Sequence, residues 1–406
     1  MKPHILINMH YLEIGGAETA LIGLLNALDP KRVDVDLFLH DHRGEMMQFV
    51  PEWVNVLPPI KEYTMLERPI TELIKRGHLL IAGARLWAKY VSRKAYKKSH
   101  SSLPNASAFH YMAKYTTPLL PRINPKVRYD LAISFLNPHQ TTAQKVNARK
   151  RIAWIHTDYT KIWVDANDEL PVWSKYNYIA SISPDVTKTF LQTFPSLANT
   201  NKIIEIENIL SPAFVRRRAD IEDVEGELNK YGGVKLLSIG RFSEAKNYDN
   251  VPDICRRMVK EGVDVKWFII GYGGDEQLIR RKIEEAGMQE HVIILGKRSN
   301  PYPYIKACDI YVQPSRYEGK SVTVREAQML CKPVVVTNYP TASSQIKSGI
   351  DGVIVPMDNE GCARGLAEVV TDKALQERLV DYLKKHDYGN ESEVDKVYRI
   401  AEEAKR

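Results

Sequence analysis

The stretch "VKLLSIGRF" at residues 234–242 decides the fold, because it is a short apolar run that leads directly into a glycine and an arginine. Further apolar runs follow it, each after a helix-like stretch: "VKWFIIGYG" (265–273), "HVIILGK" (291–297), "DIYVQPS" (309–315), "PVVVTN" (333–338) and "GVIVP" (352–356). Continuous apolar runs separated by helical patterns are typical of parallel strands buried on both faces. The second half of the chain is therefore predicted to be a doubly wound α/β domain.

The first half repeats this pattern and predicts a second doubly wound domain. Its strand-like runs lie at residues 4–12, 33–40, 129–135, 151–157 and 176–183. The polar, charge-rich segment 213–233 ends in two glycines, which favours a linker there. The predicted parts are thus an N-terminal domain (1–212), a linker (213–233), a C-terminal domain (234–388) and a terminal helix (389–406).

The composition is that of a globular protein of two or three domains. The chain has 406 residues, of which 44% are hydrophobic and 26% charged. No apolar run approaches the roughly 18 residues of a transmembrane helix, and the start of the sequence lacks a signal-peptide pattern. The cysteines are widely spaced without a CxxC pair, which argues against a metal cluster and favours a reducing cytoplasm.

The positive charge is concentrated in one segment. The net charge is +7, and residues 61–126 alone hold 13 Lys and Arg against 3 Asp and Glu. Within this basic helical insertion, apolar residues of 70–98 fall on a helical stripe that includes Trp87, and basic residues flank it. This pattern fits an interfacial helix on an anionic membrane, or a helix packed on the N-terminal domain with a solvated basic face. Nucleic-acid binding is less favoured, because no recognised binding motif accompanies the charge.

Two segments at expected strand ends could bind an anion. In "LEIGGAETALIGLLNAL" (12–28), Gly15 and Gly16 form a tight turn before a helix, whose free N–H groups suit an anion. The alternative is a plain turn; the segment is not GxGxxG, so NAD binding is unsupported. In "SIGRFSEAKNYDN" (238–250), Arg241 and Lys246 lie at the carboxyl edge of the predicted sheet, where they could bind a diphosphate or be solvated loop charges.

Two further segments carry polar side chains at strand ends. In "WIHTDY" (154–159), His156 is either a site group or a satisfied core residue. In "SRYEGKSVTVREAQ" (315–328), Glu318 lies on a loop and Glu326 about two turns into a helix. Carboxylates accept hydrogen bonds from vicinal hydroxyls; the alternative is a capping charge and a surface glutamate. The N–H groups of the intervening residues could cradle an anion at the helix start: Gly319, Lys320 and Ser321.

These motifs occur together in one known family. The GGAE turn, the GR-x4-K loop, the E-x7-E element and "CKPVVVTNYPTASSQIKSGIDGVIVP" (331–356) resemble the retaining glycosyltransferases of family 4, also described as glycosyl transferases group 1. The resemblance is specific over about 234–356 and loose in the first half. It implies the GT-B fold, with two Rossmann-like domains facing a central crevice. The first domain would bind the acceptor and the second the donor, and the last helix would cross back to the first domain.

The resemblance also implies residue roles. Glu318 would contact the donor sugar and Glu326 the nucleotide ribose, while Gly16 would approach the diphosphate. The implied catalytic residues are His156, Glu318, Arg241 and Lys246. The implied donor-binding residues are Gly15, Gly16, Arg241, Lys246, Glu318, Gly319, Lys320, Ser321 and Glu326.

The implied activity is transfer of a sugar, with retention, from a nucleotide-sugar to a glycan or lipid-linked saccharide in surface polysaccharide or glycolipid synthesis. The resemblance implies a hexosyltransferase-type enzyme that uses a UDP-linked donor and no cofactor. No DxD pair stands in a plausible donor position, which is consistent with independence from a metal ion. The expected location is the cytoplasm, with peripheral binding to the inner face of the cell membrane as one option. The alternatives are a non-catalytic nucleotide-sugar-binding or scaffold subunit, or another GT-B enzyme such as an epimerase.

Overall fold

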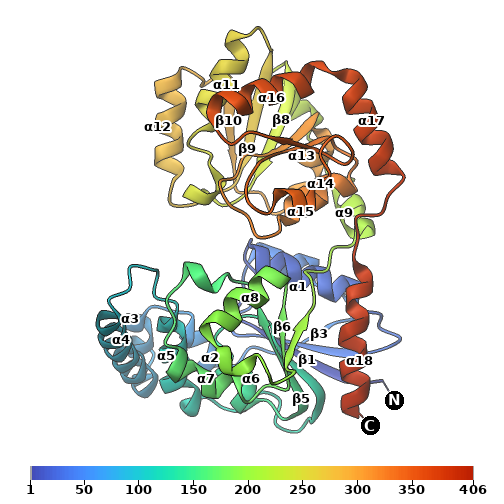
Figure 1. The fold of residues 1–406 in the computed structure, drawn as a ribbon. Helices are drawn as coiled ribbons and strands as arrows, with labels where there is room; N and C mark the ends of the chain where they lie inside the picture. The colour runs from blue at the N-terminus through green and yellow to red at the C-terminus, as the bar shows by residue number, and fades with distance from the viewer. Residues whose placement is uncertain (1, 406) are drawn as a thin grey trace. The chain divides into compact units, whose positions relative to one another are not determined.

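The computed structural model describes residues 2–405, and these form two compact units. Unit 1 comprises the described residues up to Ile209 and from Asn390 onward, and unit 2 comprises Leu210–Gly389. Each unit contains one parallel sheet with helices on both faces (Figure 1). This confirms the predicted doubly wound α/β class.

The sheet of unit 1 has seven parallel strands in the order β3-β2-β1-β4-β5-β6-β7. The strands are β1 (His4–Met9), β2 (Asp34–Leu39), β3 (Asn55–Val56), β4 (Tyr129–Ser134), β5 (Ala148–Ile155), β6 (Tyr178–Ser181) and β7 (Ile203–Glu205). The sequence pattern missed β3 and β7, which are very short strands at the two edges of the sheet. The strand order reverses between β1 and β4, which marks the switch point where ligands bind in open α/β sheets.

The sheet of unit 2 has six parallel strands in the order β10-β9-β8-β11-β12-β13. They are β8 (Val234–Ile239), β9 (Val265–Ile270), β10 (Val292–Gly296), β11 (Ile310–Gln313), β12 (Val334–Thr337) and β13 (Val353–Val355). All six correspond to runs predicted from the sequence. Here the order reverses between β8 and β11, so the loops after these two strands meet at the switch point of the sheet.

The helices cover both faces of each sheet (Figure 1). Those of unit 1 are α1 (Gly16–Ala27), α2 (Lys61–Leu66), α3 (Ile70–Lys75), α4 (Leu79–Ser99), α5 (Ser107–Thr116), α6 (Gln140–Lys145), α7 (Ala166–Trp173), α8 (Pro184–Thr193) and α18 (Val394–Lys405). Those of unit 2 are α9 (Pro212–Ala219), α10 (Glu225–Asn229), α11 (Val251–Lys260), α12 (Glu276–Ala286), α13 (Tyr302–Ala307), α14 (Val322–Met329), α15 (Ala342–Gln345), α16 (Asn359–Thr371) and α17 (Lys373–Lys384).

The segment 213–233, expected to be a linker, instead contains most of α9 and all of α10 and is part of unit 2. Leu228 of α10 is fully buried, and Glu227 accepts a hydrogen bond of 2.9 Å from the Tyr304 hydroxyl. The charge-rich composition favoured a linker, although the segment forms two short amphipathic helices. The chain therefore passes from unit 1 to unit 2 near residue 210 and returns near residue 390.

The helix α18 belongs to unit 1, although it is the last element of the chain. Its Tyr398 hydroxyl accepts a hydrogen bond of 2.6 Å from the Asp29 backbone N–H. The Arg32 guanidinium lies 3.7 Å from the centre of the Tyr398 ring. These contacts tie α18 to the loop between α1 and β2 within unit 1.

The basic insertion consists of helices α2 to α5, and the expected stripe over 70–98 is not a single face. Gly77, with φ of 79°, lies between α3 and α4 and breaks the helix. Ile81 and Ala88 of the stripe are buried, whereas Leu80 and Trp87 are exposed. No helix within residues 2–405 combines the length and apolar character needed to cross a membrane.

Candidate functional site

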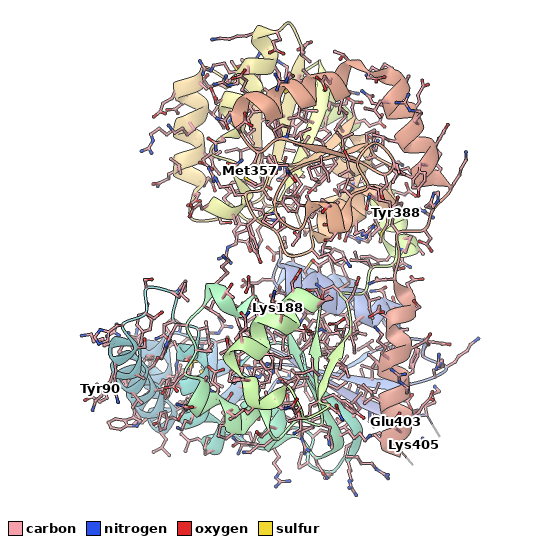
Figure 2. All side chains as sticks on the ribbon, in the orientation of Figure 1. Tyr90, Lys188, Met357, Tyr388, Glu403 and Lys405 are labelled. Carbon is pink, nitrogen blue, oxygen red and sulfur yellow. The ribbon has the colours of Figure 1, made fainter. Side chains whose placement is uncertain are left out.

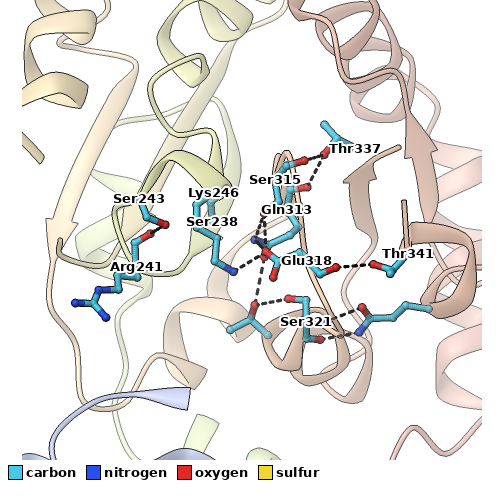
Figure 3. A network of polar contacts seen from close by, with 12 residues as sticks. Ser238, Arg241, Ser243, Lys246, Gln313, Ser315, Glu318, Ser321, Thr337 and Thr341 are labelled. Atoms are coloured by element: carbon cyan, nitrogen blue, oxygen red, sulfur yellow. Dashed lines mark hydrogen bonds and ion pairs between the residues drawn. The ribbon is translucent and has the colours of Figure 1, made fainter. Parts of the chain in front are cut away.

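The switch point of unit 2 brings a lysine and a glutamate into contact (Figure 3). Lys246 ends the short 3-10 helix Glu244–Lys246 in the loop after β8, and Glu318 lies on the loop after β11. The Lys246 Nζ and the Glu318 Oε1 are 2.5 Å apart, and the two side chains are 20% and 12% exposed. A partly buried ion pair at this edge of an α/β sheet is placed where a ligand would bind.

The Glu318 carboxylate is held by further donors from the end of β11 and beyond (Figure 3). Its Oε1 accepts hydrogen bonds from the Gln313 Nε2 at 3.0 Å and the Ser315 hydroxyl at 2.6 Å. The Thr341 hydroxyl donates to the main-chain oxygen of Glu318 at 2.8 Å. The sequence analysis missed these residues, although polar side chains at the end of the buried run "DIYVQPS" were a usable signal.

Arg241 lies at the same edge but outside the ion pair. Its side chain is exposed and points away from Lys246 and Glu318 (Figure 3). The loop that carries it passes close to the end of β9, because a Cβ at Gly271 would lie 1.9 Å from the main-chain oxygen of Gly240. Glycine at position 271 is thus needed for this loop position, and Arg241 remains accessible to a ligand in the described unit.

Glu326 lies inside α14, with a partner that differs from those of Glu318. It is 2% exposed and accepts a hydrogen bond of 2.8 Å from the Tyr302 hydroxyl. Burial raises the pKa of Glu326 to about 7, although the Tyr302 hydrogen bond acts in the opposite direction. The structure therefore supports two distinct carboxylate positions around the start of α14, one ion-paired and one buried.

Three backbone N–H groups before α14 were expected to bind an anion, but one of them already has a partner. Gly319 and Lys320 are exposed, but the Ser321 backbone N–H donates to the Gln345 Oε1 at 3.0 Å. The Gln345 Nε2 in turn donates to the main-chain oxygen of Ser321 at 2.6 Å. The expectation that Ser321 offers its N–H to a ligand is wrong, because the side chain of Gln345 already occupies that N–H.

In unit 1, the glycine turn leads from β1 into α1. Gly15 is the N-cap of α1 in an extended conformation, without a side-chain cap, and Gly16 is the first helical residue. A Cβ at Gly16 would meet no other atom within 4 Å, but a Cβ at Gly15 would lie 2.3 Å from the Glu18 carboxylate, so the Glu18 side chain lies at this helix start. An anion that binds the N–H groups of this turn would therefore have to displace the Glu18 carboxylate.

His156 follows β5 at the carboxyl edge of the unit 1 sheet. Its Nε2 is 3.0 Å from the main-chain oxygen of Phe135, to which only an N–H can donate. Burial lowers the pKa of His156 to about 4, so the ring is neutral at pH 7. The other nitrogen, Nδ1, then carries a lone pair that can accept a hydrogen bond from a hydroxyl.

A cluster of two histidines and one glutamate at this edge was not identified from the sequence. His10 directly follows β1, His40 directly follows β2, and Glu67 follows α2. The Glu67 Oε1 lies 2.8 Å from the His10 Nδ1 and 3.2 Å from the His40 Nδ1. These three side chains could ligate a metal ion, since their ligand atoms lie within 4.8 Å of one another. An ion pair of Glu67 with His10 and a hydrogen bond with His40 also explain their arrangement.

The Glu67 cluster makes stability depend on pH. Burial lowers the pKa of His10, but attraction to Glu67 outweighs it and raises the net pKa above 6.5. The Glu67 pKa is lowered from 4.5: burial opposes this change, but hydrogen bonds from both histidines outweigh it. The contribution of His10 to the free energy of unfolding is present below pH 6.5, and it is lost as the pH rises through the pKa of His10 in the folded state. The Glu67 contribution is present above pH 4.5 and is lost on acidification.

Glu67→Gln is therefore expected to lower the free energy of unfolding by about 2 kcal/mol at pH 6, and by less at pH 9, because His10 loses its charge as the pH rises through its raised pKa. Urea unfolding at the two pH values measures this difference. Glu62→Gln, on the same helix, is the matched control and should change little. An equal loss at both pH values would contradict a charged His10–Glu67 pair.

A family model supports the interpretation of unit 2. Residues 220–386, which include Arg241, Lys246, Glu318 and Glu326, match the model described as Glycosyl transferases group 1. Residues 220–386 are thus similar to a group 1 glycosyltransferase domain. Gly15, Gly16 and His156 lie outside the matched residues of this glycosyltransferase domain.

Curated relatives match a little over a third of the chain. One is the N-acetylgalactosamine-N,N'-diacetylbacillosaminyl-diphospho-undecaprenol 4-alpha-N-acetylgalactosaminyltransferase of Campylobacter jejuni, 28% identical over 35% of this chain and 38% of its own length. Another is the lipopolysaccharide core biosynthesis glycosyltransferase LpsE of Rhizobium meliloti, 25% identical over 36% of this chain and 42% of its own. The match thus spans less than half of either relative.

Solved structures match the whole described fold. Anabaena Alr3699/HepE, in a complex with UDP and glucose, has a TM-score of 0.67 at 14% identity over 99% of both chains. A point mutant of S. aureus TarM, in a complex that contains UDP, has a TM-score of 0.67 at 13% identity, covering 99% of this chain and 100% of its own. These similarities establish the GT-B fold around the glycosyltransferase domain.

Proposed function

We propose that the protein is a retaining glycosyltransferase that moves a sugar from a nucleotide-sugar, with UDP as the nucleotide, to a glycan or lipid-linked saccharide acceptor. The observation that carries this proposal is the Lys246–Glu318 pair at the switch point of unit 2, 2.5 Å apart and partly buried. It supplies a cation for a diphosphate and a carboxylate for sugar hydroxyls at one ligand-binding edge.

The chemical task is to stabilise the negative charge that develops on the leaving diphosphate. Lys246 is held near this position by Glu318, and the exposed Arg241 adds a planar guanidinium that matches phosphate oxygens. Cations fixed before the reaction stabilise the transition state without reorganisation. We propose that these two side chains do this without a metal ion or other cofactor.

The two carboxylates are proposed to divide the donor between them. Glu318, oriented by Gln313 and Ser315, would accept hydrogen bonds from hydroxyls of the transferred sugar. Glu326, buried and joined to Tyr302, would accept hydrogen bonds from the ribose hydroxyls. His156, neutral and with Nδ1 as an acceptor, is proposed to contact a hydroxyl near the transferred sugar.

The acceptor is proposed to be a saccharide linked to a membrane lipid, in the synthesis of a surface polysaccharide or glycolipid. The names of relatives support this: one acts on a diphospho-undecaprenol acceptor and another belongs to lipopolysaccharide core synthesis. We propose a cytoplasmic protein that binds peripherally to the inner face of the cell membrane. The four free cysteines fit a reducing compartment.

UDP or its sugar conjugate is expected to raise the melting temperature by about 5 °C or more at a hundredfold excess over Kd, because it binds only the folded state. The measurement is a thermal-shift screen of UDP-, GDP- and ADP-sugars without added metal, repeated with a chelator. Arg241→Ala should reduce the shift. Absence of a shift with every nucleotide-sugar would contradict the proposed donor site.

A non-catalytic nucleotide-sugar-binding subunit or an epimerase would also bind the nucleotide. Product analysis with a labelled UDP-sugar separates these functions. Transfer to an acceptor, or slow donor hydrolysis, supports the transferase, whereas an isomeric nucleotide-sugar alone would indicate an epimerase.

A further inference from the structure

The helix α4 has two faces with different environments. Ile81, Ala82 and Ala88 are buried, and the first two pack into a core cluster of unit 1 that includes Phe38 and Tyr63. Arg85 also ties α4 inward, since its Nη1 donates to the main-chain oxygen of Arg68 at 2.6 Å. The inner face therefore already explains how the helix is attached to the domain.

The opposite face of α4 exposes large apolar side chains that this packing does not use. Their exposed fractions are 62% for Leu79, 78% for Leu80, 53% for Leu86, 54% for Trp87 and 57% for Tyr90. Their spacing of three, four and seven residues places them along one side of the helix. Tyr90 lies on the outer side of this helix (Figure 2).

The same side of α4 becomes basic towards its C-terminal end. The spacing continues from Tyr90 through Arg93 and Lys94 to Lys97 and Lys98, and all four basic residues are exposed. The sequence has no Asp or Glu between Glu72 and Asp130, so these charges have no acidic neighbour within that stretch. The outer face of α4 is thus apolar over its first three turns and cationic over the rest.

We infer that the outer face of α4 binds an anionic lipid bilayer, with its apolar part inserted at the surface and its basic part on the lipid phosphates. This inference rests on the proposed action on a membrane-linked acceptor. An amphipathic helix with Trp on the apolar side and Lys or Arg on the polar side is suited to the membrane interface. Trp87 and Tyr90, with ring centres 5.6 Å apart, lie where the apolar part meets the basic part, the position that such rings occupy at headgroup depth.

The basic part borders a groove suited to a single lipid headgroup. Lys94 and Lys98 line an open cavity of about 600 Å³ between α4 and residues 163–167, together with the apolar Val91 and Trp163. The one carboxylate of this lining, Asp165, accepts hydrogen bonds from the Tyr111 hydroxyl and the Asp168 N–H. The cationic rim and apolar lining complement a lipid phosphate and the first part of its acyl chains.

The test is flotation of the full chain with vesicles of phosphatidylcholine, with and without phosphatidylglycerol, at low and high salt. Leu80→Ser with Trp87→Ser should lower the partition coefficient more than tenfold at either salt. Lys94→Gln with Lys97→Gln and Lys98→Gln should lower it on the order of a hundredfold at low salt, and less at high salt. Both variants change exposed side chains, so their melting temperatures should match the unmodified chain.

Matched controls lie in unit 2. Ile221→Ser with Ile350→Ser removes two exposed apolar side chains, and Lys373→Gln with Lys384→Gln and Lys385→Gln removes three lysines from around α17. Neither should change flotation. Equal binding of all variants, or no binding of the unmodified chain to anionic vesicles, would overturn the inference.

Two further readouts separate the other outcomes. Self-association of the unmodified chain that the Leu80 and Trp87 changes abolish, without vesicle binding, would assign this face to a second copy of the chain and overturn the inference. The UDP thermal shift should be the same in all these variants, because α4 is not part of the donor site. Loss of flotation with a normal UDP shift thus tests the membrane surface alone, whereas a missing UDP shift in the unmodified chain contradicts the proposed function instead.

Discussion

Lys246→Ala is expected to lower kcat/KM for sugar transfer by about 10²- to 10³-fold, which is the usual effect of removing one fixed charge-stabilising group. Arg241→Ala should act in the same direction, because both cations would neutralise the leaving diphosphate. Glu318 keeps two hydrogen bonds, from Gln313 and Ser315, when Lys246 is removed. The variant should therefore fold normally, and steady-state kinetics with the preferred nucleotide-sugar would report the loss.

The matched control for Lys246 is Lys306→Ala. Lys306 also forms a lysine–carboxylate pair in unit 2, with Asp220 at 2.8 Å, but both side chains are more than half exposed. Such surface pairs contribute little to stability, and this one lies outside the proposed site. Normal turnover in both the Lys246 and Arg241 variants would remove these residues from the donor site.

The second large effect is expected at Glu326, where Glu326→Gln should weaken UDP binding by about tenfold or more. The glutamine can keep the Tyr302 contact but loses the charge that strengthens hydrogen bonds from ribose hydroxyls. Because burial raises the pKa of Glu326 to about 7, UDP affinity should increase between pH 6 and pH 8 as the carboxyl ionises. Calorimetric titration of UDP at several pH values measures both effects.

The glutamine variant also distinguishes the pH dependence of UDP affinity that comes from Glu326 from the part that comes from the nucleotide itself. Any pH dependence that remains in Glu326→Gln belongs to the UDP phosphate or to other groups. The raised pKa means that charging Glu326 costs folding free energy, so the variant should be no less stable above pH 7.

Glu318→Ala should instead impair transfer and largely spare UDP binding. Equal weakening of UDP binding in both variants would contradict the division of the donor between the two glutamates.

The parallel strands of unit 2 were predictable because each is an apolar run long enough to stand out between helical patterns. The edge strands β3 and β7 were not, since two or three residues carry no periodicity and form only by pairing with β2 and β6. The prediction of a linker at 213–233 was wrong for a related reason. Its composition favoured a linker, but a few apolar residues such as Leu228 suffice to bury one side of a short helix.

Lys246 and Glu318 could be singled out from the sequence because each lies in a loop that follows an apolar, strand-like run. Spacing could not reveal contacts from other helices, such as Gln345 of α15 with the Ser321 N–H or Tyr302 of α13 with Glu326. The stripe over 70–98 shows the same limit. Helical periodicity identified an apolar helix, but only packing distinguishes Ile81, which lies in the core, from Leu80, which faces water.

The return of the chain to unit 1 has a consequence for biosynthesis. Unit 2 is continuous in sequence, whereas unit 1 needs α18, whose Tyr398 contacts Asp29 and Arg32 near the beginning of the chain. Domains generally fold as units during synthesis on the ribosome. Unit 2 can therefore complete its core as soon as its last residue emerges, while unit 1 stays open until α18 has been made. Unit 1 is in this sense finished after unit 2, although most of its residues are made earlier.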